Sequence, residues 1–249
     1  MRFLRSDLLS GLLVAAFVAA NPAAAADILT PEAEVRRAAF EHPSVVARYG
    51  GLYGDRALNI YLNEIGERLS VAANDDRWKF RFTLLDNPNA VAFAVAGGYI
   101  YVSRTMLGLA NSEAEIAAVL AHEMAHVIER HSVRRAEMEN AQRQAKTFPD
   151  AAAFQILARE QEIEADILGV KIIAAAGYDP MAQARFLQTI GEFSQLSNQV
   201  GLIEGRSNDP ESHPTIAIRI AAASEAAAEA EISIQPWGAE GQTLGYDAA

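Results

Sequence analysis

The chain has 249 residues, of which 51% are hydrophobic and 21% are charged, so it holds enough apolar material for a substantial core. Its 21 Lys and Arg against 32 Asp and Glu give a net charge of -11, which disfavours binding to nucleic acids and anionic lipid surfaces. Because there is no cysteine, disulfides, thiol nucleophiles and Cys-based metal sites are excluded, and any metal must bind through His and carboxylates.

The first 26 residues have the pattern of a secretory signal peptide. Arg2 and Arg5 form a basic start, residues 8–20 form an apolar stretch, and residues 23–26 are all alanine. The apolar stretch is shorter than the about 20 residues that a membrane span requires. We therefore predict cleavage after Ala26 and export to the periplasm, with no transmembrane segment in the mature protein; an uncleaved anchor is the alternative.

Helix and strand patterns succeed one another in the first half of the mature chain. Thr30 can cap a helix that begins at Pro31, and apolar side chains recur at helical spacing after Asp55. Apolar and polar residues then alternate, and a Gly-Gly pair separates two further β-prone stretches. We predict helices from residue 30 and over residues 55–72, a strand over residues 78–84, and a β-hairpin over residues 91–102 with its turn at residues 97–98.

Helices dominate the second half. Ser112 and Glu115 form a capping box that opens a helix running past Ser132. The polar segment that follows is predicted to be a flexible or lid-like connection, and Gly, Asn, Asp and Pro residues mark a later loop. The connection covers residues 137–149, the loop covers residues 198–214, and helices are predicted over residues 151–176, 179–196 and 215–231. Without repeats or a linker, residues 27–231 are predicted to form one domain, followed by a tail over residues 232–249.

The sequence HEMAH at residues 122–126 carries the strongest chemical signal. Four residues of helix turn through about 400°, so His122 and His126 project from one face, as two ligands of a tetrahedral zinc ion do. Glu123 lies about 100° around the helix, where it can act as general base on a metal-bound water. Two surface histidines on an amphipathic helix are the alternative. His131, nine residues after His122, would face the opposite side and is interpreted as a helix-end or buried hydrogen-bonding residue.

A third ligand is predicted on the helix after the polar connection. Glu162 and Asp166 are four residues apart and share a helix face, whereas Glu164 points elsewhere. Zinc bound by Glu162, with Asp166 accepting the N–H of a ligand histidine, would compensate the repulsion between the two carboxylates. A solvated acidic helix face is the other interpretation.

These motifs resemble those of the zinc metallopeptidases that include HtpX, the CAAX prenyl endopeptidases, mitochondrial Oma and periplasmic BepA. The likeness covers residues 49–220 and includes HExxH at 122–126, ExxxD at 162–166, and Ser-His-Pro at 212–214 with Arg219 beyond it. It implies an α+β zincin-type fold, mostly helical, with a small sheet or hairpin beside the active-site helix. It also implies one Zn²⁺ per chain on His122, His126 and Glu162, with Glu123 as base and Asp166 orienting a ligand histidine.

His213 and Arg219 are further candidates for the active site. Pro214 biases His213 toward an extended backbone, and the resemblance places its imidazole over the zinc, with Arg219 near the same cleft. Either residue could donate to the oxyanion of the reaction, or His213 could be a fourth ligand that keeps the enzyme latent. A capping histidine without catalytic role is the third interpretation.

We expect an exported zinc-dependent endopeptidase that degrades or processes misfolded cell-envelope proteins. Its predicted partners are unfolded envelope substrates and the outer-membrane assembly machinery. The alternative function is an envelope chaperone or assembly factor with a latent metallopeptidase site. The hairpin at residues 91–102 is predicted either to present a free strand edge on which an extended substrate adds, or to be simply part of the core.

Overall fold

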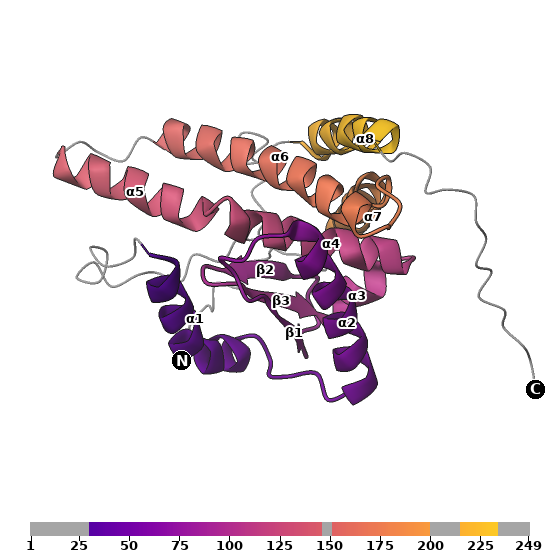
Figure 1. The fold of residues 1–249 in the computed structure, drawn as a ribbon, viewed down its shortest axis with the longest axis horizontal. Coiled ribbons are helices and arrows are strands. Elements are labelled where there is room, and N and C mark those ends of the chain that lie inside the picture. Colours follow the sequence, from indigo (N-terminus) through magenta and orange to yellow (C-terminus); the bar gives the residue numbers. More distant parts are fainter. Residues whose placement is uncertain (1–29, 146–150, 200–214, 234–249) are drawn as a thin grey trace, which may run out of the picture.

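The computed structural model describes residues 30–145, 151–199 and 215–233 (Figure 1). The predicted signal peptide and His213 lie outside these residues. The helices and strands, in chain order, are α1 (Pro31–Arg48), α2 (Arg56–Ala73), β1 (Arg81–Leu85), β2 (Ala92–Val95), β3 (Tyr99–Ser103), α3 (Arg104–Leu109), α4 (Glu113–Ile128), α5 (His131–Gln144), α6 (Ala151–Ala175), α7 (Ala182–Gln199) and α8 (Ile216–Ser233).

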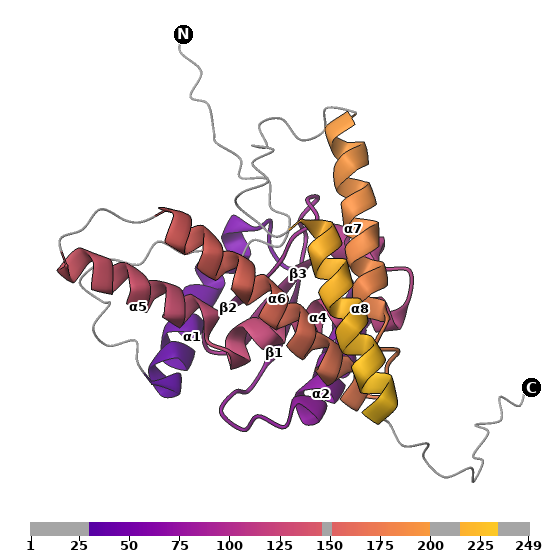
Figure 2. The ribbon, with the colours of Figure 1, turned by 90° about the horizontal axis from the view of Figure 1, so that it is seen from above.

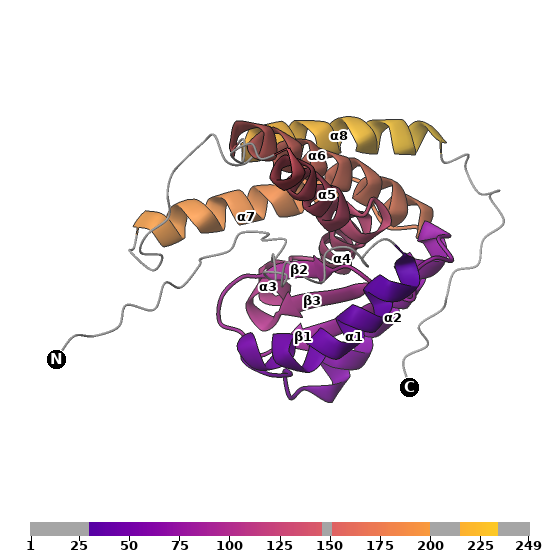
Figure 3. The same ribbon diagram turned by 90° about the vertical axis from the view of Figure 1, so that its left-hand side faces the viewer.

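A small sheet lies between helix α1 on one face and helices α2 and α4 on the other. Ala38 and Val45 of α1 pack against the face that carries Phe93 and Tyr101, whereas α2 and α4 share one core with the opposite face. Helix α4 also lies next to β2 (Figures 1 and 3). Helix α6 packs on α4, and α8 packs on α6 and α7, so the C-terminal helices form a second and third layer above α4 (Figure 2). The protein is therefore mostly helical with a small sheet, which confirms the predicted α+β class.

The sheet has the strand order β1-β3-β2. Strands β2 and β3 form the predicted antiparallel hairpin, with Phe93 opposite Tyr101, and β1 pairs in parallel with β3, with Arg81 opposite Tyr99. The turn between β2 and β3 is shaped by Gly97, which has a φ of 102°. A Cβ at this position would lie 2.7 Å from the carbonyl oxygen of Glu34 in α1, so only glycine allows the hairpin to approach that helix.

Three helices begin with a side-chain N-cap, two of them, at Thr30 and Ser112, as the sequence predicts. The side chains of Thr30, Asp55 and Ser112 accept hydrogen bonds from the backbone amides of Ala33, Leu58 and Glu115. These local interactions satisfy amides that have no partner inside the helix, which is why they can be predicted from short sequence patterns.

The helix that carries the HEMAH motif ends earlier than predicted. Helix α4 stops at Ile128, Arg130 adopts a left-handed conformation with a φ of 51°, and a separate helix, α5, begins at His131. This backbone conformation is unfavourable for arginine, and an ion pair between Arg130 and the buried Glu34 of α1 stabilises it. The predicted lid-like connection is also wrong over residues 137–144, because these residues belong to α5.

In the part of the chain that the structure describes, no helix combines the length and the apolar character that crossing a membrane requires.

Candidate metal centre

His122, His126 and Glu162 come together in the layer between α4 and α6. The Nε2 atoms of the two histidines are 3.1 Å apart, and the Glu162 carboxylate oxygens lie 3.7 Å and 3.5 Å from the Nε2 atoms of His122 and His126. Tetrahedral zinc with bonds of about 2.0–2.2 Å separates its ligand atoms by about 3.3–3.5 Å. All three side chains are buried, so the spacing of their donor atoms suits a single zinc ion.

Close packing of α6 on α4 brings the carboxylates within reach. Gly169 of α6 faces the backbone of His122, and a Cβ there would lie only 3.2 Å from the His122 nitrogen. Ala165 is fully buried in the same layer. Small residues on this face of α6 let the two helix axes approach, and Glu162 and Asp166 then reach the histidines from adjacent turns.

The surroundings of the two histidines leave their Nε2 atoms free for a cation. Nδ1 of His122 lies 2.9 Å from Asp166, and Nδ1 of His126 lies 2.7 Å from Nδ1 of His131. Although burial acts to lower it, the pKa of His122 is raised by Asp166, whereas burial holds the pKa of His126 well below its usual range. A carboxylate beside Nδ1 holds the ring proton there, so Nε2 of His122 carries a lone pair, as a metal ligand requires.

Glu123 lies beside this group without belonging to it. Its side chain is buried, its Oε1 atom has no hydrogen-bond partner among the described residues, and the backbone N–H of Ala94 in β2 donates to its carboxylate. Burial raises the pKa of Glu123 to about 7. A buried carboxylate with a free oxygen next to a metal site can exchange a proton with a water there.

Arg219 of α8 holds the two carboxylates of α6. Its guanidinium lies 2.7 Å from Oδ2 and 2.8 Å from Oδ1 of Asp166, and 3.0 Å from Oε2 of Glu162. Although burial opposes ionisation, Arg219 and His122 lower the pKa of Asp166 to about 2. These contacts differ from the sequence hypothesis of an oxyanion donor, because they direct the guanidinium toward protein carboxylates and indicate a positioning role.

Replacing Arg219 with methionine is expected to lower the free energy of unfolding of the metal-free protein by about 3–5 kcal/mol, because it leaves buried carboxylates without their cation. Urea unfolding in the presence of a chelator measures this change. Arg185→Met is the matched control: Arg185 is 45% exposed and pairs with Asp179 at 2.8 Å, so its loss should cost less than about 1 kcal/mol. Equal losses for the two variants would refute the role given to Arg219.

The ion pair between Arg219 and Asp166 also predicts how the loss of unfolding free energy in Arg219→Met depends on pH. The pKa of Asp166 is lowered in the folded protein, so its stabilising contribution is present at neutral pH and disappears as the pH falls toward about 2. The difference in unfolding free energy between the wild type and Arg219→Met should therefore narrow between pH 5 and pH 2. A difference that stays constant over this range would contradict the ion pair.

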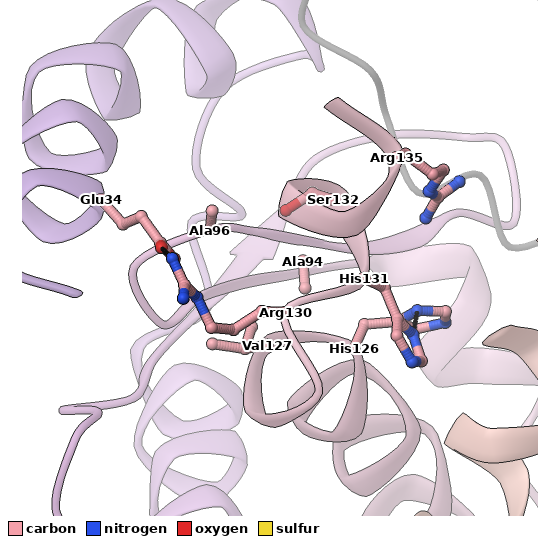
Figure 4. A pocket seen from close by; sticks show the side chains of 9 residues that line it. All are labelled: Glu34, Ala94, Ala96, His126, Val127, Arg130, His131, Ser132 and Arg135. Atoms are coloured by element: carbon pink, nitrogen blue, oxygen red, sulfur yellow. Dashed lines mark hydrogen bonds and ion pairs between the residues drawn. The ribbon is translucent and has the colours of Figure 1, made fainter. Parts of the chain in front are cut away.

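A pocket opens between the free edge of β2, the end of α4 and the start of α5 (Figure 4). Ala94 and Ala96 contribute small side chains, and His126 connects the pocket to the metal group. The pocket is lined by Glu34, Ala94, Ala96, His126, Val127, Arg130, His131, Ser132 and Arg135. It thus lies beside strand β2 and next to the clustered His and Glu side chains.

The structure adds His131 to the surroundings of the predicted ligands. The helix geometry that would separate His131 from His122 does not apply, since the chain turns at Arg130 and returns His131 to His126. A left-handed arginine is an uncommon conformation without a local sequence signal. His131 is buried and hydrogen-bonded, as one of its two interpretations expected. The predicted roles of Ser-His-Pro remain predictions, because residues 212–214 lie outside the described residues.

Comparison with known proteins places these residues in a family context. The sequence profile of peptidase family M48 matches residues 56–154 and 148–227. The chain is 30% identical over 202 residues to the beta-barrel assembly-enhancing protease of Yersinia pestis, covering 65% of this chain and 41% of that protein. The corresponding Escherichia coli K12 protein is 29% identical over 175 residues, covering 59% and 36%.

A mitochondrial relative shows the same likeness. The mitochondrial metalloendopeptidase OMA1 of Schizosaccharomyces pombe is 28% identical over 152 residues, covering 52% of this chain and 45% of that protein. The chain thus spans less than half the length of these three relatives. The family profile, in contrast, covers more than half of the chain and includes both helices that supply the clustered His and Glu side chains. On this evidence the chain belongs to peptidase family M48.

Proposed function

We propose that this protein is an exported zinc-dependent endopeptidase that cleaves unfolded or misfolded proteins of the cell envelope. The observation that carries the proposal is the spacing of His122, His126 and Glu162, with the free carboxylate oxygen of Glu123 beside them. One Zn²⁺ per chain would be held by the first three residues, and Asp166 and Arg219 would keep His122 and Glu162 in position.

A zinc ion held by His122, His126 and Glu162 would supply Lewis-acid chemistry, which activates water and polarises a carbonyl group. Glu123 then takes a proton from the attacking water and delivers it to the leaving amine. Its pKa of about 7 suits a group that must both accept and release a proton near neutral pH. Burial of the surrounding side chains keeps bulk water from competing with these transfers.

Strand β2 is proposed to hold the substrate. It is one of the two edge strands of the sheet, and the backbone N–H of Ser103 donates to the carbonyl of Val91, which fixes the alternation of hydrogen-bonded pairs along the hairpin. Ala92 and Ala94 consequently direct their backbone groups away from β3. An extended peptide can add to this edge through main-chain hydrogen bonds, which depend little on its sequence.

This binding mode predicts an alternating response to backbone methylation of a peptide substrate. N-methylation of single amides should raise KM at every second position, because successive amides of an extended strand point to opposite sides. Steady-state kinetics on a series of singly N-methylated peptides measures the pattern. A uniform response, or none, would argue against addition to β2.

The envelope as the site of action rests on the signal-like residues 1–26 and on the relatives named beta-barrel assembly-enhancing proteases. Unfolded outer-membrane proteins are accordingly the proposed substrates, and the outer-membrane assembly machinery is the proposed partner. The net charge of -11 disfavours nucleic acid as a partner.

The printed names of these relatives also favour a second candidate, a chaperone or assembly factor that acts without cleavage. Casein hydrolysis and suppression of aggregation, measured side by side for the wild type and Glu123→Gln, separate the two. Hydrolysis that only the wild type performs supports the endopeptidase. Aggregation suppression that both proteins perform equally, without hydrolysis by either, supports the chaperone.

A further inference from the structure

We propose that His131 is a positioning residue that orients the ligand His126 and connects it to the carboxylate of Glu164. The inference rests on the proposed metal centre and deepens it, since the sequence motifs assign no partner to His126. Its basis is a continuous line of polar contacts from α4 through the start of α5 to α6.

The two rings are in direct contact. Nδ1 of His131 lies 2.7 Å from Nδ1 of His126, and the rings meet edge to face at 79° (Figure 4). On its other side, Nε2 of His131 lies 3.2 Å from Oε2 of Glu164, which is also paired with Arg134. His131 thus uses both ring nitrogens, one toward the ligand and one toward a carboxylate.

Metal binding would leave only one arrangement of protons along this line. A neutral His126 that binds through Nε2 carries its proton on Nδ1, so it donates to His131. Nδ1 of His131 must then be the acceptor, and its proton resides on Nε2, where Glu164 accepts it. Both ligand histidines therefore lead to a carboxylate, His122 directly to Asp166 and His126 through His131.

The charge at the centre explains why a neutral ring, and not another carboxylate, contacts His126. Glu123, Glu162 and Asp166 are already buried there, and the cations around them are Arg219, Arg135 and the proposed divalent ion. A fourth buried carboxylate would have to lose its hydration, whereas a neutral ring avoids this cost. His131 is fully buried, whereas the side chain of Glu164 is 45% exposed and has its own cation in Arg134, so the negative charge stays near solvent.

The position of His131 is fixed by two contacts, one of its own backbone and one of the preceding residue. Its backbone carbonyl accepts a hydrogen bond of 3.0 Å from Nε2 of the buried Gln161. The preceding residue, Arg130, is held by Glu34 of α1. A ligand's partner that is held this firmly can restrict the rotation of the imidazole and keep its Nε2 directed at the metal.

Zinc affinity and a substitution pair test this role. His131→Leu removes both polar contacts and should weaken zinc binding about 10- to 100-fold, measured by competition with a chromophoric chelator. His131→Gln keeps an acceptor and a donor on one side chain, so it should restore most of the affinity. His42→Leu, on α1 against Tyr101, is the matched control and should bind zinc like the wild type. Wild-type zinc affinity in a folded His131→Leu would overturn the proposal.

A measurement on the wild type tests the proposed placement of protons on His126 and His131 even if His131→Leu does not fold. Nitrogen-15 NMR of the zinc-loaded wild type should show Nδ1 protonated on His126 and unprotonated on His131. A proton on Nδ1 of His131 would refute the proposed relay, that is, the line of hydrogen bonds from His126 through His131 to Glu164. His126→Ala separates the two levels of inference: wild-type zinc binding by this variant would refute the metal centre itself, whereas lost binding with an unaffected His131→Leu would refute the relay alone.

Discussion

Glu123→Gln is expected to lower kcat for hydrolysis of unfolded protein by about 10²- to 10⁴-fold while one zinc ion per chain remains bound. Glutamine has nearly the same shape as glutamate but cannot take a proton from water. The substitution should also preserve the fold, because the amide oxygen can still accept from the backbone N–H of Ala94. Cleavage of casein and metal content, measured on the same preparations, provide the two readouts.

Glu160→Gln provides the control for this experiment. Glu160 lies exposed on α6, so its substitution changes the net charge equally without touching the centre, and activity should remain at the wild-type level. If Glu123→Gln hydrolysed casein like the wild type, Glu123 would not be the base. If it lost zinc as well, the assignment of Glu123 as a residue outside the ligand set would be wrong.

Removal of a proposed ligand, unlike the substitution of Glu123, is expected to abolish zinc binding. His122→Ala, His126→Ala and Glu162→Ala should each lose stoichiometric zinc, because three protein ligands are needed to hold a catalytic zinc ion with one position open. Zinc should raise the Tm of the wild type, since it binds the folded state, and this increase should disappear in the three variants. Metal analysis after dialysis and thermal unfolding with and without zinc measure both effects.

The choice of control on α6 matters for the ligand test. Glu164 was the natural sequence-based control for Glu162, but it contacts His131 and so is connected to His126. Glu160→Ala is the better comparison because its side chain is exposed on the same helix. Zinc binding that survives in Glu162→Ala but fails in Glu160→Ala would show that the wrong carboxylate has been assigned.

The local parts of this protein could be read from the sequence because their causes are local. The N-caps of α1, α2 and α4 involve residues three positions apart, and the hairpin turn at Gly97 requires a conformation that glycine favours. The shared face of His122 and His126 follows from helical periodicity alone. The sequence therefore predicted a mostly helical fold with a hairpin, and it predicted that His122, His126 and Glu162 would lie together in a group that could hold a metal ion.

Tertiary contacts decided what the periodic patterns left open. The end of α4 depends on Arg130, whose left-handed backbone is supported by Glu34 almost a hundred residues earlier. The parallel pairing of β1 with β3 has no turn signal, because β2 separates the two strands in the sequence although they are direct neighbours in the sheet. Arg219 reaches Asp166 and Glu162 because α8 packs on α6, and spacing within one helix cannot specify that contact.

The position of His131 shows most clearly that local sequence patterns cannot predict a contact created by long-range packing. Continued as one helix, the chain would carry this residue away from His122, and the sequence offers no local cause for a break. In the folded protein, an ion pair between α1 and the end of α4 redirects the chain and returns His131 to His126. Helical periodicity was enough to identify side chains that could bind a metal, whereas long-range packing places the side chains that contact those ligands.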